Sequence, residues 1–188
     1  MTLIKSISGI RGTIGGKTGD NLTPVDAVKF ASAYGTWLKG HSGKEKLTVV
    51  IGRDARISGP MIHTLVMNTL VGLGIDVIDL GLSTTPTVEV AVPLEKADGG
   101  IILTASHNPK QWNALKLLND QGEFLSGDDG AEIFQLFHIA LNLFILDRVH
   151  RQRDRPHTGQ LEPPRKPARC RRCRRSIPTT TTKLHLPC

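Results

Sequence analysis

The residues most able to do chemistry lie in three short segments rich in glycine, hydroxyl and charged side chains. Residues 104–109 read Thr-Ala-Ser-His-Asn-Pro, residues 52–59 contain two arginines and an aspartate, and residues 8–12 contain Arg11 together with two glycines. Arginine binds phosphate through paired hydrogen bonds, and glycine lets backbone N–H groups approach an anion. This combination predicts a site for a phosphorylated ligand, where Ser106 offers a hydroxyl and His107 an imidazole.

Hydrophobic periodicity and capping residues predict the elements that would position these segments. We expect a loop or hairpin over 1–20 and strands over 47–51, 75–80, 99–103 and 115–118. The first helix is expected to start at Thr23-Pro24 and end near Gly40, and the second to run from Ser58, its cap, to Gly74. A third helix should start at Thr85-Pro86, with a disturbance at Pro93, and a fourth should cover 130–146. Strands that alternate with helices predict an α/β fold, with a single sheet covered by helices on both faces.

Two of the three segments follow predicted strands directly. Ligands of open α/β sheets bind at the carboxyl ends of the strands, so residues 52–59 and 104–109 are expected to meet there. Lys116 comes ten residues after Ser106, on the strand expected to lie beside it, and could bring an ammonium group near that hydroxyl. We expect His41 and His63 to be satisfied structural or surface residues.

Two familiar motifs are absent. The Gly72-Leu-Gly74 segment follows a predicted helix and lacks the third glycine of a dinucleotide fingerprint. Ser106 has Thr104 and Asn108 where a nucleophile elbow requires glycine, so an acyl-transfer triad is disfavoured.

Charge divides the chain into two parts. Residues 1–137 hold 12 Lys and Arg against 14 Asp and Glu, whereas residues 138–188 hold 12 against 3. This split excludes a uniformly basic nucleic-acid-binding domain, and the absence of cysteine before Cys170 excludes a disulfide scaffold. The sequence shows no secretory signal pattern and no apolar run near the ~20 residues that span a bilayer, so we expect a cytoplasmic protein with no membrane partner.

Residues 148–188 predict an irregular, disordered tail rich in arginine and proline. Such an abrupt change of composition is also what a shifted reading frame yields. The alternative function is a basic-tailed protein that binds nucleic acid or acidic partners through this tail on a non-catalytic α/β scaffold. We expect no specific nucleic-acid partner, only non-specific binding of polyanions. The tail also holds four candidate zinc ligands, namely Cys170, Cys173, His185 and Cys188.

Residues 104–109, with the Ser-Gly-Ile-Arg-Gly and Gly-Arg-Asp segments before them, closely resemble the α-D-phosphohexomutase superfamily, and most of all bacterial phosphoglucosamine and phosphomannomutases. The resemblance covers about residues 2–137, and it predicts an N-terminal α/β domain over 1–137, whose last helix could continue to 147. Ala114 departs from the family's usual Asn-Gly-x-Lys pattern, which here reads Asn113-Ala114-Leu115-Lys116.

The resemblance implies an intramolecular phosphotransferase that moves phosphate between C6 and C1 of a hexose or hexosamine phosphate. Ser106 would carry the phosphoryl group, with Mg²⁺ on the phosphoserine oxygen and a hexose 1,6-bisphosphate as intermediate and activator. Lys116 and Arg11 would stabilise charge, and His107 would contact substrate or move a proton. Four further residues would bind phosphate or brace the loops, namely Arg53, Asp54, Thr104 and Asn108.

The resemblance also predicts what this sequence lacks. The family's Asp-x-Asp-x-Asp-Arg metal loop, which would supply three magnesium ligands, does not occur in these 188 residues. A serine oxygen alone does not satisfy the octahedral oxygen coordination of Mg²⁺. We therefore expect the isolated chain to be inactive or nearly so, and the sequence does not indicate which sugar phosphate is used.

Overall fold

The computed structural model describes residues 1–6 and 9–139. The predicted continuation of the last helix to 147, the tail over 148–188 and its four candidate zinc ligands lie outside the described residues. Within the described ranges, no helix is long and apolar enough to cross a membrane.

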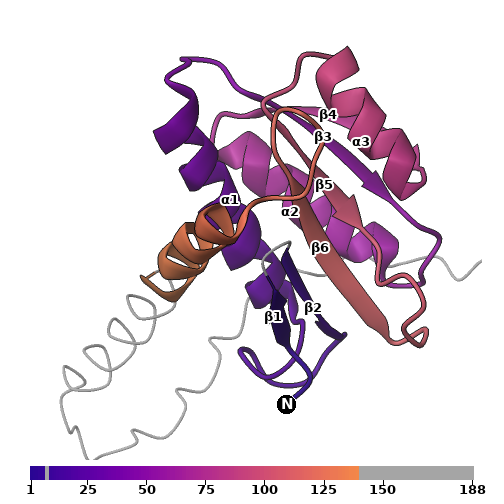
Figure 1. Cartoon of the computed structure of the whole chain (residues 1–188). Coiled ribbons are helices and arrows are strands. Elements are labelled where there is room, and N and C mark those ends of the chain that lie inside the picture. Colours follow the sequence, from indigo (N-terminus) through magenta and orange to yellow (C-terminus); the bar gives the residue numbers. More distant parts are fainter. Residues whose placement is uncertain (7–8, 140–188) are drawn as a thin grey trace, which may run out of the picture.

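One six-stranded sheet organises the described residues, in the order β1-β2-β6-β5-β3-β4 (Figure 1). The strands are β1 (Ile4–Ser6), β2 (Gly9–Thr13), β3 (Thr48–Arg53), β4 (Asp76–Leu82), β5 (Gly99–Leu103) and β6 (Trp112–Leu118), and the helices are α1 (Pro24–Ser42), α2 (Gly59–Gly72) and α3 (Thr85–Leu94), followed by helical residues 127–139.

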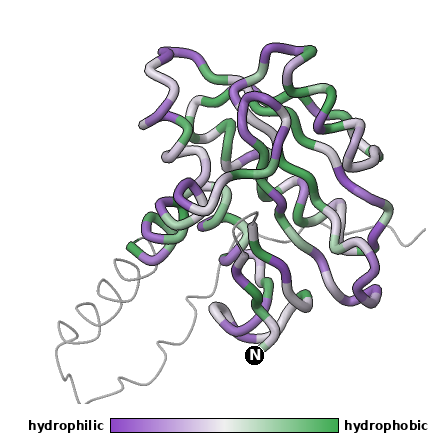
Figure 2. The backbone as a smooth tube through the Cα atoms, viewed as in Figure 1, coloured by the Kyte–Doolittle hydropathy of each residue, from purple (hydrophilic) through white to green (hydrophobic). Residues whose placement is uncertain are grey.

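Helices cover both faces of this sheet, as the sequence predicts. On one face, α1, α2 and helical residues 127–139 pack over the larger core, in which Phe30, Ile62 and Phe137 are buried. On the other face, α3 packs Val88 and Val92 over a smaller core on the central strands. The hydrophobic colouring in Figure 2 follows these central strands, consistent with a sheet shielded from water on both sides.

The sheet contains both parallel and antiparallel strand pairs, and the alternation of strands and helices in the sequence does not predict this mixture. β3 pairs in parallel with β4 and β5, as the predicted β-α-β alternation requires. β6 instead runs antiparallel to β5 and to β2, which forms the predicted hairpin with β1. Gly9 makes this attachment possible, because a Cβ there would lie 1.9 Å from the carbonyl oxygen of Leu115.

The predicted start of α1 is confirmed and its predicted end is wrong. Thr23 caps the helix: its side chain accepts from the Asp26 N–H while the Asp26 carboxylate accepts from the Thr23 N–H. The helix passes through Gly40 to Ser42, and Gly43 terminates it with φ of 62°. A glycine costs an exposed helix only about 1 kcal/mol relative to alanine, so Gly40 does not end it.

The predicted cap of α2 also needs correction. Ser58 precedes α2 but its side chain makes no capping hydrogen bond. Its Oγ instead accepts from Asn113 Nδ2 at 2.9 Å, which ties α2 to β6. The predicted start of α3 at Thr85-Pro86 is confirmed, with Thr84 as its N-cap. The predicted disturbance at Pro93 falls one residue before α3 ends.

The last described helix starts at residue 127, three residues earlier than predicted. Ser126 caps it, since its Oγ accepts from the Asp129 N–H at 3.2 Å and donates to the Asp129 carboxylate at 2.6 Å. Phe134 and Phe137 pack on Phe30 of α1, with ring centroids 5.6 and 5.9 Å away. This aromatic contact fixes the helix against α1.

Both histidines expected to be structural have partners. His41 stacks on Trp37 and its Nε2 lies 3.1 Å from the Glu132 carboxylate, which also accepts from the Trp37 indole. His63 on α2 bonds the Asp79 carboxylate of β4 at 2.9 Å. These contacts join helices to each other and to the sheet.

Candidate functional site

The loop that contains Ser106 joins two buried antiparallel strands, β5 and β6. β5 is buried throughout, and it pairs in parallel with β3, so both strands end at the same edge of the sheet. The backbone N–H of Asp54, directly after β3, donates to the Leu103 carbonyl at the end of β5 (3.1 Å). Residues 52–59 and 104–109 are therefore neighbours, as the sequence predicts.

Asp54 connects the two loops through its carboxylate. One oxygen accepts from Thr104 Oγ1 at 2.7 Å and from Arg56 Nε at 3.1 Å, and the other accepts from the Arg56 backbone N–H at 3.0 Å. Thr104 in turn accepts from the Ser106 N–H at 3.1 Å. The predicted residues Asp54 and Thr104 thus form a chain of hydrogen bonds that ends on the backbone of Ser106.

Arg56 is the residue that the sequence interpretation missed as a site residue. Its guanidinium donates to four backbone carbonyls of the serine loop, at 2.6 Å for Ser106, 2.8 Å for Asn108, 2.8 Å for Pro109 and 3.0 Å for Trp112. Its position three residues after Arg53 was visible in the sequence, but nothing there distinguished a loop-binding arginine from a phosphate-binding one.

Ser106 lies at the exposed tip of this loop. Its φ of 52° is in the left-handed region, which few residues other than glycine adopt. Within the described residues, its hydroxyl makes no hydrogen bond, although its backbone N–H and carbonyl both do. The backbone is held and the hydroxyl is left available to a ligand.

The two polar residues after Ser106 differ in their surroundings. His107 is exposed and forms no hydrogen bond with any residue in the described part of the chain. Asn108 bonds inward, because its side-chain amide donates to the Ala105 carbonyl at 2.8 Å and its backbone N–H donates there at 3.0 Å. In this structure Asn108 shapes the loop, and His107 is the one free to meet a ligand.

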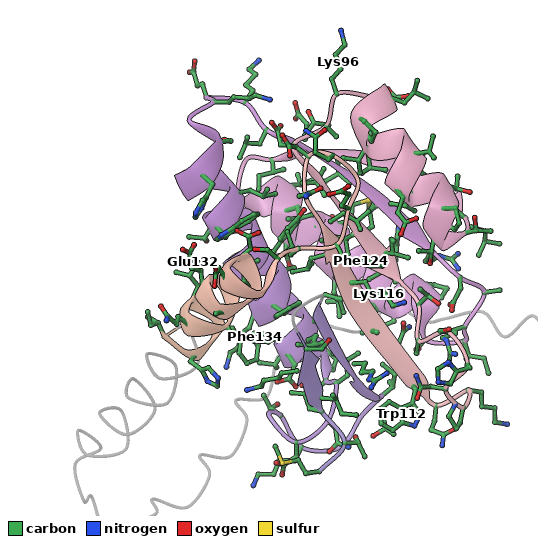
Figure 3. All side chains as sticks on the ribbon, viewed as in Figure 1. Lys96, Trp112, Lys116, Phe124, Glu132 and Phe134 are labelled. Atoms are coloured by element: carbon green, nitrogen blue, oxygen red, sulfur yellow. The ribbon has the colours of Figure 1, made fainter. Side chains whose placement is uncertain are left out.

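Arg11 and Lys116 share one face of the sheet on neighbouring strands. Arg11 of β2 pairs with Ala114 of β6, and side chains two residues apart in a strand point to the same face, so Lys116 follows on that face. Arg11 is exposed. The Lys116 ammonium lies 5.7 Å from the ring centroid of Phe124, and Figure 3 shows the two side chains next to each other. Among the described residues, Lys116 forms no contact with Ser106.

Arg53 contacts the loop in which it lies. Its Nη1 donates to the Asp54 carbonyl at 3.2 Å, and its side chain passes beside Gly59 at the start of α2, 3.5 Å from where a Cβ would stand. The contact joins the end of β3 to α2 at the same edge of the sheet as Ser106.

The described residues contain no group of three or more His, Cys, Asp or Glu side chains that could hold a metal ion. Asp54, the acidic residue nearest to Ser106 in the network, is engaged by Arg56 and Thr104. These residues therefore do not form a magnesium site by themselves.

Comparison with known proteins gives one consistent family. The family that matches is described as phosphoglucomutase/phosphomannomutase, alpha/beta/alpha domain I, and the match covers residues 3–141. A phosphoglucomutase/phosphomannomutase of Thermococcus kodakarensis is 41% identical over 128 residues, which is 67% of this chain and 28% of that protein. A phosphoglucosamine mutase of Limosilactobacillus fermentum is 40% identical over 116 residues, or 62% of this chain and 26% of that protein.

Solved structures agree with the sequence relatives. A phosphoglucomutase/phosphomannomutase family protein of Burkholderia thailandensis superposes with a TM-score of 0.60 at 27% identity, covering 73% of this chain and 30% of that one. A chain from Thermus thermophilus gives a TM-score of 0.64 at 29% identity with the same coverage. This chain thus spans about a quarter of the length of the curated relatives above.

Proposed function

Because the chain belongs to the phosphoglucomutase/phosphomannomutase family through its domain I, we propose that Ser106 carries the phosphoryl group in a phosphohexomutase reaction. The substrate class is a hexose or hexosamine phosphate, and the reaction moves phosphate between C6 and C1. The observation that carries this proposal is the exposed Ser106 hydroxyl on a loop whose backbone is fixed from both sides.

The proposed reaction has two transfers that balance. Phosphoserine at position 106 gives its phosphoryl group to a hydroxyl of the sugar monophosphate, which leaves a bound hexose 1,6-bisphosphate and a free serine hydroxyl. The sugar then reorients, and its other phosphoryl group returns to Ser106. Phosphoryl transfer depends mostly on positioning and charge stabilisation, so a fixed loop is the structural feature that it requires.

We assign the nearby cations to charge stabilisation. Arg11 is exposed on β2 and Lys116 lies on the same face of β6, so both could meet phosphate oxygens of a sugar bound over these strands. Lys116 would have to leave the ring of Phe124, and a cation–π contact at an exposed site is worth only about 0.5–1 kcal/mol. His107, exposed beside Ser106, would contact the substrate or move the proton of the sugar hydroxyl.

Magnesium belongs to the proposal as a requirement that the described residues do not satisfy by themselves. Ser106, through its phosphate, would contribute one oxygen ligand. The described residues offer no acidic cluster to complete an octahedral set. Phosphohexomutase turnover by this chain would therefore require ligands from other residues.

A domain exchange tests the proposed function directly. Residues 1–137 would replace the matching region of the Thermococcus kodakarensis relative, so that the rest of that protein supplies whatever this chain lacks. The rate of conversion between hexose 6-phosphate and hexose 1-phosphate would be measured for this protein and for its Ser106→Ala and Ser42→Ala variants. Ser42 is the matched control because it ends α1 and lies with Asp98 and Asn119, at the opposite ends of β5 and β6 from the serine loop.

We expect turnover in the domain-exchange protein and in Ser42→Ala, and none above background in Ser106→Ala. Turnover that survives Ser106→Ala would overturn the assignment of Ser106. A folded domain-exchange protein that binds sugar phosphate without turnover would instead indicate a phosphate-binding domain that no longer catalyses.

A further inference from the structure

We propose that Arg56 is a positioning residue, which holds the loop over 104–112 in the shape that presents Ser106, and that it does not bind the phosphate itself. The effect on catalysis rests on the proposed function. The effect on the loop follows from the contacts alone and can be measured without any reaction.

The hydrogen bonds of the Arg56 guanidinium use all of its donors. The group has five N–H bonds, and it makes five hydrogen bonds: Nε to the Asp54 carboxylate, Nη1 to the carbonyls of Pro109 and Trp112, and Nη2 to those of Ser106 and Asn108. The side chain is only 11% exposed. No donor remains for a phosphate oxygen, so a ligand could bind Arg56 only by dismantling the loop.

The same contacts explain the backbone of Ser106. A residue held at φ of 52° without being glycine persists only where its surroundings fix it. Here Arg56 holds the Ser106 carbonyl at 2.6 Å, and Thr104 holds its N–H at 3.1 Å. Arg56 and Thr104 both donate to the same Asp54 oxygen, so one network fixes the backbone N–H and the carbonyl of Ser106.

Position 56 requires arginine because of the geometry of its N–H donors and not because of its positive charge. Its planar fork presents five donors at fixed angles, whereas lysine has three donors around one nitrogen. Lysine at position 56 would keep the positive charge beside Asp54 but could not serve four carbonyls spread from Ser106 to Trp112. Arg56→Lys therefore separates positioning from charge.

Hydrogen exchange on the full 188-residue chain measures the positioning role. In Arg56→Lys, amides of the serine loop that are hydrogen-bonded in the wild type, such as those of Asn108 and Trp112, should exchange about tenfold faster or more. The amides of β3 should be unchanged. The matched control is Arg11→Lys, which changes an exposed arginine outside the loop and should leave loop exchange as in the wild type.

Two results would overturn the proposal. Unchanged exchange over 104–112 in Arg56→Lys would show that the loop does not depend on the fork. Faster exchange to the same degree in the loop and in β3 would show a general effect on folding. If Arg56→Lys does not fold, Asp54→Asn replaces it, although this change disturbs both the Nε anchor of Arg56 and the Thr104 hydrogen bond to the same oxygen. It should still raise exchange selectively over 104–112, and by more than Thr104→Val, which leaves the Arg56 anchor in place.

The domain-exchange protein supplies the second readout. Arg56→Lys should lower kcat by roughly 100-fold and leave KM for sugar phosphate within about threefold, because the hydroxyl is misplaced while the binding cations remain. A raised KM with unchanged kcat would instead identify Arg56 as a phosphate ligand. Absence of Ser106-dependent turnover with Arg56 intact would count against the proposed function, and the exchange result would still decide the role of Arg56.

Discussion

At the scale of single residues, the candidate site is a hydrogen-bond network in which charged side chains hold the serine loop in place. Asp54 and Arg56 form an ion pair with a carboxylate-to-Nε distance of 3.1 Å, and each also bonds the serine loop. The family resemblance placed Asp54 and Thr104 among residues that would bind phosphate or brace the loops, and the structure shows them bonded to each other between the two loops. The sequence could not predict the role of Arg56, because four of its five acceptors are main-chain carbonyls that any residue could provide.

Replacing Asp54 with asparagine should destabilise the chain by about 1.5–3 kcal/mol, the usual range for hydrogen bonds to a charged group. The amide would present N–H bonds toward Arg56 or Thr104, both of which donate to the native carboxylate. Urea unfolding measures the change. The control is Asp20→Asn, since Asp20 forms an exposed 3.8 Å pair with Lys17 and should cost less than about 1 kcal/mol. If both variants lost the same free energy of unfolding, the hydrogen bonds of Asp54 would not stabilise the chain as proposed.

Tyr34, the only tyrosine of the chain, should make folding sensitive to alkaline pH. Burial raises the pKa of its hydroxyl well above the ordinary value of 10.0. Above pH 10 the unfolded chain loses this proton and the native chain keeps it, so the free energy of unfolding should fall by about 1.4 kcal/mol per pH unit. Below pH 10 the contribution is fully present.

Ultraviolet absorbance of tyrosinate reports Tyr34 alone, because no other tyrosine contributes. We expect tyrosinate to appear only together with unfolding, as followed by circular dichroism. The fall in stability attributable to Tyr34 is obtained by comparison with Tyr34→Phe, which lacks the titrating group. Tyrosinate that forms near pH 10 in a still folded chain would contradict the burial argument.

At the scale of elements, the ends of a helix or strand could be predicted from the sequence where residues within or next to that element determine them. The bounds of β5 match the predicted 99–103, and Thr23 caps α1 as expected. The limits of β6 were too narrow, because Trp112 and Asn113 enter the strand by pairing with β2, about 100 residues earlier in the chain. Pairing between distant segments is set by tertiary packing, which a local pattern does not contain.

The junction of α1 with the sheet depends on Gly99 having no side chain. The Tyr34 hydroxyl donates to the Leu118 carbonyl at 2.7 Å, and a Cβ on Gly99 would lie 2.1 Å from that hydroxyl. Gly99→Ala should therefore cost about 1–3 kcal/mol in the wild type. It should cost at least about 1 kcal/mol less in a Tyr34→Phe background, where the nearest obstacle is gone.

A double-mutant cycle followed by chemical unfolding measures this coupling. Gly40→Ala is the matched control, because nothing lies within 4 Å of a Cβ at that exposed helical position. It should be neutral or stabilising by up to about 1 kcal/mol. Strictly additive effects of Gly99→Ala and Tyr34→Phe would show that the contact with α1 does not limit position 99.

At the scale of the whole molecule, the chain provides a mutase domain I whose serine loop is formed within the domain. The site prediction depended on one specific segment, residues 104–109, and on the family it resembles. The fold then accounts for which predicted residues act together: Asp54, Thr104 and Asn108 shape the loop, whereas Ser106, His107 and Arg11 are exposed to a ligand.

Magnesium titrated into the 188-residue chain should give no saturable binding, because the described residues provide no cluster of acidic ligands. Isothermal calorimetry checks this expectation, with the domain-exchange protein as the comparison that should bind. Saturable one-to-one binding by the chain alone would show that its own residues complete the site.

The sharpest test of the proposed function is to locate the phosphoryl group on the protein. The domain-exchange protein would be treated with hexose 1,6-bisphosphate and magnesium, digested, and mapped by mass spectrometry. We expect one phosphoryl group on Ser106, which is lost when hexose monophosphate is added in excess. If the protein turns over with Ser106 unmodified throughout, or with the phosphoryl group on another residue, Ser106 is not the phosphoryl carrier.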